Sequence, residues 1–113
     1  MSKKEEKIAL YRKAAEALDL GLDPDFIAKV TDGLGPSIYN RDAETVSCSD
    51  ASELERVREN FLKKKLGLSE SDATLDAAIR EVCDKMGSSN RNKYRALFYA
   101  LLAKKFGKES LYA

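Results

Sequence analysis

Residues 90–106 read NRNKYRALFYALLAKKF and place apolar or small side chains on nearly every face of a helix. One side carries the larger side chains of Tyr94, Leu97, Phe98, Leu101 and Leu102. The other side carries Ala96, Tyr99, Ala100 and Ala103. A helix without a strongly polar stripe is usually buried among other elements. The spacing therefore predicts that residues 90–106 form the central, buried helix of the fold.

Two amphipathic helices are expected near the N-terminus. The first has apolar positions three and four residues apart and ends near Gly21. Asp23 is a suitable cap for the second helix, and Pro24 suits its first position because proline lacks the N–H that a helix leaves unused there. We expect this short helix to stop at Gly33 or Gly35.

Two further helices are expected between these and the central helix. Asp50 caps one of them, with Glu53 three residues later completing a capping box. Ser69 and Asp72 repeat this arrangement before the other helix, which ends at Gly87. No segment shows the alternation of a strand, so the pattern is typical of helices packed on helices.

Length and composition limit both the fold and the chemistry. The 113 residues amount to one domain, and we predict an all-α, compact single domain over residues 1–113, with about five helices and a buried C-terminal helix. The chain contains no histidine, which excludes the familiar Ser-His-Asp and Cys-His catalytic pairs and a Cys/His zinc site. We therefore expect a protein that is not an enzyme and that has no metal and no cofactor.

The two cysteines are expected to remain free thiols. Cys83 falls on an apolar stripe, where free cysteine behaves as a small hydrophobic residue, and Cys48 lies between two serines in a connecting segment. The charged N-terminus shows no secretory signal, and no stretch approaches membrane-spanning length. These features predict a soluble cytoplasmic protein without membrane contact, in which thiols stay reduced.

The segment at residues 35–49 is long for an unstructured connection. In one interpretation it is a structural loop that Ile38, Tyr39 and Val46 pin to the core, because apolar side chains need burial. In the other interpretation it is a functional loop, since long loops in compact domains often carry binding residues. The sequence leaves both interpretations open.

Several motifs beyond Val30 are shared with a known family. They are GLGPSIYN at residues 33–40, NFL at 60–62, KKLGL at 64–68, SNR at 89–91 and FGKE at 106–109. In this respect the chain resembles the bacterial family called domain of unknown function 2853. The resemblance implies a cytoplasmic, compact helical domain whose shape is loosely related to the EF-hand arrangement. It implies no activity, because the family has no established catalytic or binding residues.

An EF-hand-like shape prompts a comparison of residues 42–53 with a calcium-binding loop. The acidic residues at ligand positions are Asp42, Glu44, Asp50 and Glu53. Val46, however, stands where an oxygen ligand belongs, and Ser47 replaces the glycine that permits the sharp turn. We therefore predict no calcium site and interpret the acidic residues as helix caps and turn formers.

Cations gather at the expected start of the last helix. Arg91, Lys93 and Arg95 would stand in its first turns, where the helix dipole disfavours positive charge unless a negative partner lies nearby. In one interpretation, Arg91 or Arg95 reaches Asp42 or Glu44 and pins the long loop to the central helix.

In the other interpretation these cations hold a phosphate-type anion. The hydroxyl groups of Ser88 and Ser89 and the free backbone N–H groups around Asn90 would then join Arg91, Lys93 and Arg95. The order of helix, turn and helix also resembles a helix-turn-helix DNA-binding domain. A recognition helix needs an exposed polar face, however, and Arg95 is the only charged residue in residues 94–103.

Two classes of binding function remain open. We expect a module that binds a protein partner, a second copy of itself or a small ligand. The alternative is binding of an anion or of nucleic acid through the basic start of the last helix, although we expect no nucleic-acid partner.

Calcium provides a first test of these predictions. Because Val46 and Ser47 interrupt the ligand pattern, we expect millimolar calcium to leave the melting temperature unchanged in a thermal denaturation experiment. A calcium-dependent rise of several degrees that the Glu53→Gln variant abolishes would contradict this expectation.

Overall fold

Helices build the protein in a computed structural model that describes residues 2–112. Along the chain they are α1 (Lys3–Ala17), α2 (Pro24–Leu34), the 3-10 helix η1 (Gly35–Tyr39), α3 (Arg41–Glu44), α4 (Ala51–Arg56), the π-helix η2 (Val57–Lys65), α5 (Asp72–Met86), α6 (Arg95–Lys105) and the 3-10 helix η3 (Glu109–Tyr112). Between residues 2 and 112 there is no strand, and one isolated β-bridge joins Thr45 to Tyr94. The all-α prediction is confirmed. None of the helices in this part of the chain has the length and apolar character of a membrane span.

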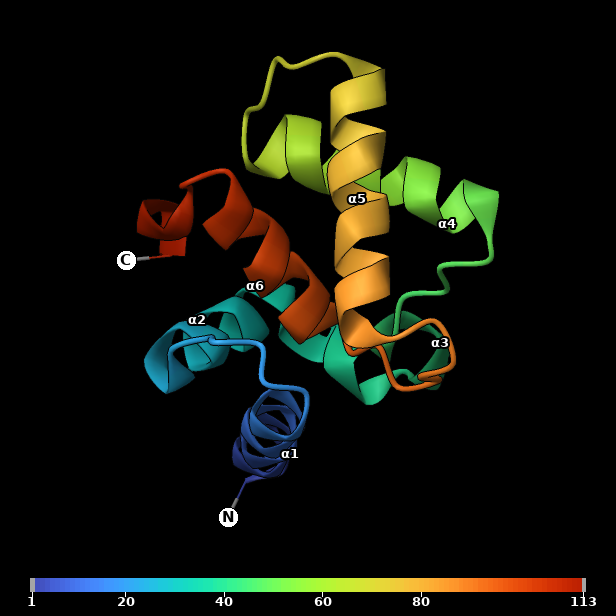
Figure 1. Ribbon diagram of the computed structural model, residues 1–113. Coiled ribbons are helices and arrows are strands. Elements are labelled where there is room, and N and C mark those ends of the chain that lie inside the picture. Colours follow the sequence, from blue (N-terminus) through green and yellow to red (C-terminus); the bar gives the residue numbers. More distant parts are fainter. Residues whose placement is uncertain (1, 113) are drawn as a thin grey trace.

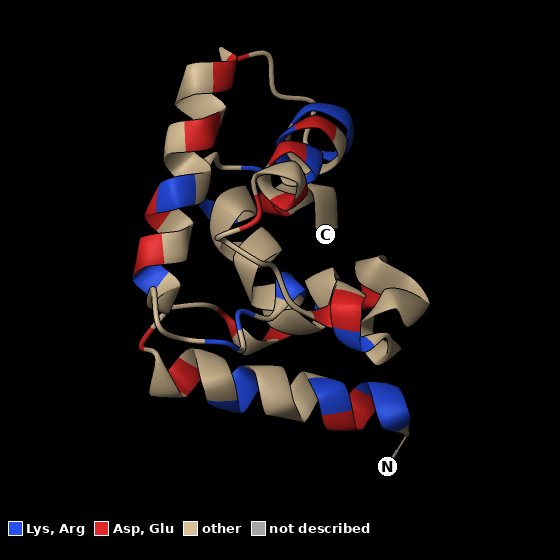
Figure 2. Ribbon diagram, turned by 90° about the vertical axis from the view of Figure 1, so that its right-hand side faces the viewer, with Lys and Arg blue, Asp and Glu red and all other residues tan. Residues whose placement is uncertain are grey.

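Helix α6 lies at the centre of the protein and is buried, as the sequence predicts. Figure 1 shows α6 running obliquely beside α2 and α5, and α6 also contacts α1, α3 and η3. Its buried residues are Ala96, Leu97, Phe98, Ala100, Leu101, Leu102 and Ala103. In Figure 2, charged residues recur along α1 and α5, whereas α6 has none between Arg95 and Lys104. Burial of this apolar surface favours the packing of the other helices around α6.

Helix α6 begins at Arg95 instead of near Asn90. The β-bridge to Thr45 and the hydrogen bond from the Val46 N–H to the Lys93 carbonyl, at 2.9 Å, hold the preceding residues in a non-helical conformation. Arg91 and Lys93 therefore lie outside the helix. The prediction that all three cations oppose the helix dipole is wrong, because the dipole acts on Arg95 alone.

Most of the predicted helix ends are confirmed, with one change of cap, but α1 ends at Ala17 and not near Gly21. Asp23 and Asp50 cap α2 and α4 by accepting hydrogen bonds from backbone N–H groups of the first turn. The N-cap of α5 is Ser71, whose hydroxyl oxygen accepts from a backbone N–H group, and not Ser69. Helix α2 ends at Gly35, whose φ of 64° lies in the left-handed region that favours glycine.

The third predicted helix is in fact two helices of different kinds. Helix α4 passes into the π-helix η2 at Val57, and the Leu66 N–H donates a π-type hydrogen bond to the Phe61 carbonyl at 2.9 Å. The wider turns keep Val57, Phe61 and Leu62 buried together. The Phe61 ring stacks on Tyr99 of α6, with ring centroids 3.8 Å apart. Packing against the central helix therefore accompanies the departure from α-helical winding.

The long segment between α2 and α4 is folded, since it contains both η1 and α3. Ile38 and Val46 are buried, as expected of residues that pin the segment to the core. Tyr39 does not contribute in this way, because it remains 47% exposed.

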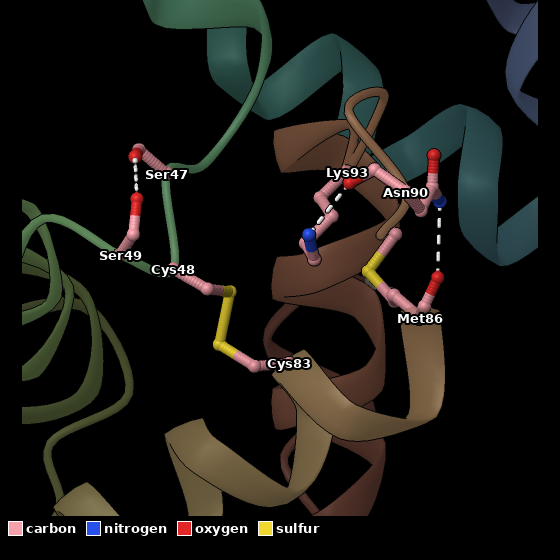
Figure 3. The surroundings of a disulfide bond; sticks show 7 residues. All are labelled: Ser47, Cys48, Ser49, Cys83, Met86, Asn90 and Lys93. Carbon is pink, nitrogen blue, oxygen red and sulfur yellow. Dashed lines mark hydrogen bonds between the residues drawn. A yellow bond between two sulfur atoms is a disulfide. The ribbon is translucent and has the colours of Figure 1, made fainter. Parts of the chain in front are cut away.

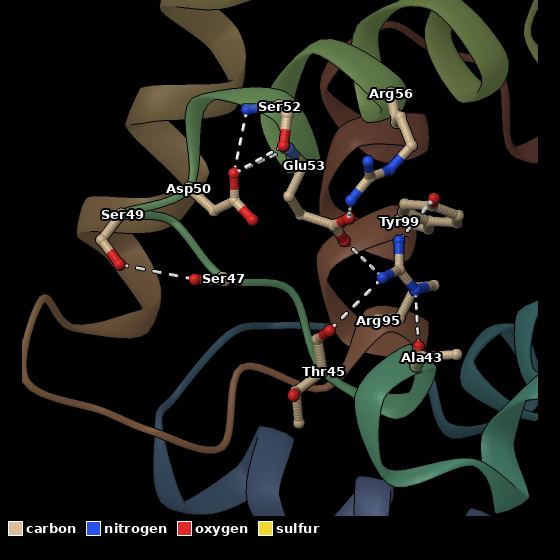
Figure 4. A network of polar contacts seen from close by, with 10 residues as sticks. All are labelled: Ala43, Thr45, Ser47, Ser49, Asp50, Ser52, Glu53, Arg56, Arg95 and Tyr99. Carbon is tan, nitrogen blue, oxygen red and sulfur yellow. Dashed lines mark hydrogen bonds and ion pairs between the residues drawn. The ribbon is translucent and has the colours of Figure 1, made fainter.

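Arg95, the first residue of α6, holds this segment in place (Figure 4). Its guanidinium donates to the carbonyl oxygens of Ala43 at 2.6 Å and of Thr45 at 3.3 Å, and to the Tyr99 hydroxyl at 2.9 Å. It also forms an ion pair with Glu53 of α4. One buried side chain thus joins α6 to α4 and to the segment between them.

The acidic partners of Arg95 differ from those that the sequence suggests. Glu44 instead accepts hydrogen bonds from the Lys7 ammonium and the Tyr11 hydroxyl, both at 2.7 Å, which joins α3 to α1. Asp42 is exposed and accepts no contact from Arg95. The guanidinium of Arg95 instead bonds the backbone carbonyls on either side of Glu44 and pairs with Glu53.

The Glu53 carboxylate is stabilised in its charged form. Burial alone would raise the pKa of Glu53, but hydrogen bonds from Arg95 and Arg56 outweigh burial and hold the pKa below its ordinary value of 4.5. Because the carboxylate faces these two guanidinium groups, it does not complete the predicted capping box with Asp50.

Acid titration tests this ion pair. Because the pKa of Glu53 is lower in the folded than in the unfolded protein, the pair stabilises the fold above about pH 5, and this stabilisation is lost as the pH falls through the folded pKa. We expect the free energy of unfolding, measured by urea denaturation, to fall less steeply with acidification in Glu53→Gln than in the wild type. At neutral pH the variant should be less stable by about 3 kcal/mol, because Arg95 is left buried without its carboxylate.

The matched control is Glu55→Gln, which changes an exposed carboxylate on the same helix. This control should retain the wild-type dependence on pH. Identical acid profiles for Glu53→Gln and the wild type would show that the ion pair contributes nothing to stability.

Candidate anion-binding site

A hollow of about 820 Å³ lies where the second half of α5, the turn at residues 88–93 and the segment at residues 45–49 meet. Three cationic side chains line it, those of Arg80, Arg91 and Lys93, against the one carboxylate of Asp84. We call this cavity the basic hollow. Its excess of positive charge and its wall of polar groups are typical of a site for an anion.

The structure brings together most of the residues that the sequence predicts for an anion site. Those in the wall of the basic hollow are Ser88, Ser89, Asn90, Arg91 and Lys93. Arg95 is not among them, because its guanidinium is engaged with Glu53 and with the neighbouring carbonyls. The predicted loop residues Asp42 and Glu44 also lie outside this wall.

Asn90 shapes the turn that forms one side of the hollow. Its side-chain amide donates to the Met86 carbonyl at 3.0 Å and accepts from the Asn92 N–H at 2.9 Å (Figure 3 shows the first contact). Gly87, with a φ of 98°, lets the chain leave α5 in a conformation that other residues rarely adopt. The turn therefore returns across the end of α5 and carries Lys93 into the wall of the hollow.

Lys93 is an unusual component of this wall, because a buried lysine normally has a negative partner. The residue is only 7% exposed, and its ammonium group donates to the Asn90 carbonyl at 2.6 Å. Within residues 2–112, this is the one hydrogen bond that the ammonium makes, and it makes no ion pair. A positive charge is thus held beside a cavity with only a neutral oxygen to compensate it.

A disulfide bond joins Cys48 to Cys83 at the edge of the hollow (Figure 3). The prediction of two free thiols is therefore wrong. The residues are 35 positions apart, and their Cα atoms lie 6.1 Å from each other, within the usual range for a disulfide. The folded path of residues 45–49 along α5 makes the pairing possible, and the spacing of cysteines in the sequence does not reveal that path.

Among the residues of the hollow that sequence reasoning missed are its charged groups on α5 and the two cysteines: Cys48, Arg80, Cys83 and Asp84. A signal was present, since Arg80 is three residues before Cys83 and four residues before Asp84. Positions three or four apart share a helix face, so Arg80 follows the cysteine to the same cavity. What the sequence could not show is that this face of α5 meets the turn at residues 88–93.

Other types of site receive no support from the described residues. Between residues 2 and 112, no group of three or more acidic or cysteine side chains is arranged to hold a metal ion. Of the predicted loop carboxylates, Glu44, Asp50 and Glu53 are each engaged in separate hydrogen bonds. The middle of α6 is buried, so α6 cannot act as the exposed recognition helix of a DNA reader.

Comparison with known proteins agrees with the resemblance seen in the sequence. A family model described as "Protein of unknown function (DUF2853)" matches residues 9–110, which include every residue named in the wall of the basic hollow. No curated protein matches the chain. The chain therefore belongs to the DUF2853 family of proteins of unknown function.

Proposed function

We propose that this protein is a binding module for a small anionic ligand, such as a phosphate or carboxylate compound, which occupies the basic hollow. The observation that carries this proposal is the Lys93 side chain, which is 7% exposed, and whose ammonium group donates to a neutral carbonyl and has no ion pair within residues 2–112. Holding an ammonium group away from water costs several kcal/mol unless a negative charge compensates it. An anion in the hollow would supply that charge.

The other groups in the wall suit the same class of ligand. Arg91 and Arg80 are exposed at the hollow and can pair with an oxyanion, and arginine presents several N–H donors in one plane. The hydroxyl groups of Ser88 and Ser89 add neutral donors. The volume of about 820 Å³ lies within the range of sites for small molecules.

The source of the protein, its cellular location and its lack of enzymatic activity are part of the same proposal. A bacterial, cytoplasmic protein is supported by the family resemblance. A role in binding, as opposed to enzymatic catalysis, is supported by the lack of histidine and of any recognisable catalytic arrangement.

Lys93→Met tests the proposal because it keeps the length of the side chain and removes its charge. We expect inorganic phosphate or pyrophosphate at about 10 mM to raise the melting temperature of the wild type by about 4 °C, relative to a chloride buffer of equal ionic strength. The variant should lose this response. Without phosphate it should be as stable as the wild type or more stable by about 1 kcal/mol, because an uncompensated buried charge has been removed.

Two further variants make the result decisive. Lys64→Met removes an exposed charge from η2, away from the hollow, and should respond to phosphate as the wild type does. Arg91→Gln changes an exposed residue and should weaken the response without loss of folding. If phosphate and pyrophosphate stabilise neither the wild type nor Lys64→Met, the proposed function is wrong. Retention of DNA that depends on Arg91, without a phosphate effect, would favour nucleic-acid binding instead.

A further inference from the structure

The disulfide bond of this protein is open to a reagent that enters the basic hollow. Both cysteines line the hollow. Cys83 is 8% exposed, whereas Cys48 is only partly buried, so Cys48 is the more exposed of the two residues. Since accessibility is one of the factors that govern thiol–disulfide exchange, a thiol in the hollow has a route to Cys48.

The surrounding structure holds Cys48 near α5 by contacts that do not involve the bridge. On one side of it, the Val46 N–H donates to the Lys93 carbonyl at 2.9 Å, and Arg95 holds the Thr45 carbonyl. On the other side, Asp50 caps α4. Opening the disulfide would therefore leave the two cysteines close together. Close proximity of two groups favours their reaction with each other, so the bridge can form again.

The charge around the bridge favours anionic partners. Lys93 and Arg80 lie in the same cavity as the sulfur atoms, and Arg80 is one helical turn before Cys83 on α5. Cations near a cysteine stabilise the thiolate, which is the form that leaves when a disulfide is opened. The same cations raise the local concentration of an anionic reagent.

We propose that Cys48 and Cys83 form a reversible thiol–disulfide centre that exchanges with small anionic thiols bound in the basic hollow. This inference rests on the proposed function, because the cations that bind the anion also select the reagent. It goes beyond binding, since the ligand reacts with the protein. In a cytoplasmic protein, disulfides are usually transient and serve catalysis or redox sensing.

The exchange proceeds in two balanced steps. The thiolate sulfur of the reagent bonds to Cys48 Sγ as the Cys48–Cys83 bond breaks, and the electron pair of that bond leaves on Cys83 as a thiolate. A second thiolate then bonds to the sulfur of the reagent held on Cys48, which releases a small-molecule disulfide and the Cys48 thiolate. In total, two reagent thiols are oxidised to one disulfide, and the Cys48–Cys83 bridge gains the two electrons. Each cysteine thiolate then takes up a proton from water. In the reverse of the first step, the Cys83 thiolate attacks Cys48 and expels the reagent.

The charge of the thiol provides the test. The oxidised protein is treated at low ionic strength with 2-mercaptoethanesulfonate, 2-mercaptoethanol or cysteamine, which are anionic, neutral and cationic. The rate of opening is measured by alkylation and mass spectrometry and expressed per thiolate present. We expect the anionic thiol to react about tenfold faster than the cationic one, and high salt to remove the difference. Equal rates, or a faster reaction with cysteamine, would overturn the proposal.

Variants separate this inference from the proposed function. Lys93→Met should reduce the preference for the anionic thiol, whereas Lys64→Met should retain it. Cys83→Ser leaves no resolving thiol, so it should accumulate one molecule of reagent on Cys48 when it is treated with the symmetrical disulfide of 2-mercaptoethanesulfonate. If phosphate still stabilises the protein but the thiols show no charge preference, the exchange centre alone is wrong. If phosphate has no effect either, both proposals fail.

The fold of the reduced protein gives a second, independent criterion. We expect the far-UV circular dichroism spectrum at 25 °C to be the same before and after reduction, and removal of the reductant in air to restore the bridge. Loss of helical signal on reduction would overturn the proposal, because the bridge would then be a structural requirement. Free thiols in protein purified without reductant, and no bridge after air oxidation, would overturn it as well.

Discussion

Arg95 stands where three segments that are distant in the sequence meet. Its guanidinium holds the carbonyl oxygens of Ala43 and Thr45 and pairs with Glu53, so the start of the buried helix, the end of α3 and the start of α4 are fixed together. A residue that lacked either the charge or the reach of arginine would leave two backbone carbonyls without this donor and Glu53 with Arg56 alone.

The basic hollow is a consequence of that arrangement. With Thr45 held by Arg95, the next residues pair with the chain before α6 and then run along α5, where Cys48 meets Cys83. The turn at residues 88–93 closes the remaining side and carries the ammonium of Lys93. The polar cavity, the buried cation and the disulfide thus share one structural origin. The two proposals share it too, because Lys93 and both cysteines line the same hollow.

Local patterns predicted the fold better than they predicted the site. The buried character of α6 and the caps at Asp23 and Asp50 follow from residue spacing and from hydrogen bonding within a few residues, so the sequence contains them. The start of α6 at Arg95 depends on pairing with residues about fifty positions away, which no local pattern records. The turn residues of the hollow are neighbours in the sequence, so a local pattern identified them. The groups of α5 that face the turn are brought to it only by folding, so no local pattern identified those. The disulfide was missed because its two cysteines become neighbours only in the folded chain.

The π-helix η2 also bears on how relatives of this protein should be aligned. A π-helical turn differs from an α-helical turn by one additional residue between hydrogen-bonded partners. A relative that is one residue shorter between Val57 and Lys65 would wind there as an α-helix and still present an apolar face to α6. A gap of one residue at this place therefore indicates a change in helix type, with the flanking helices left in their places.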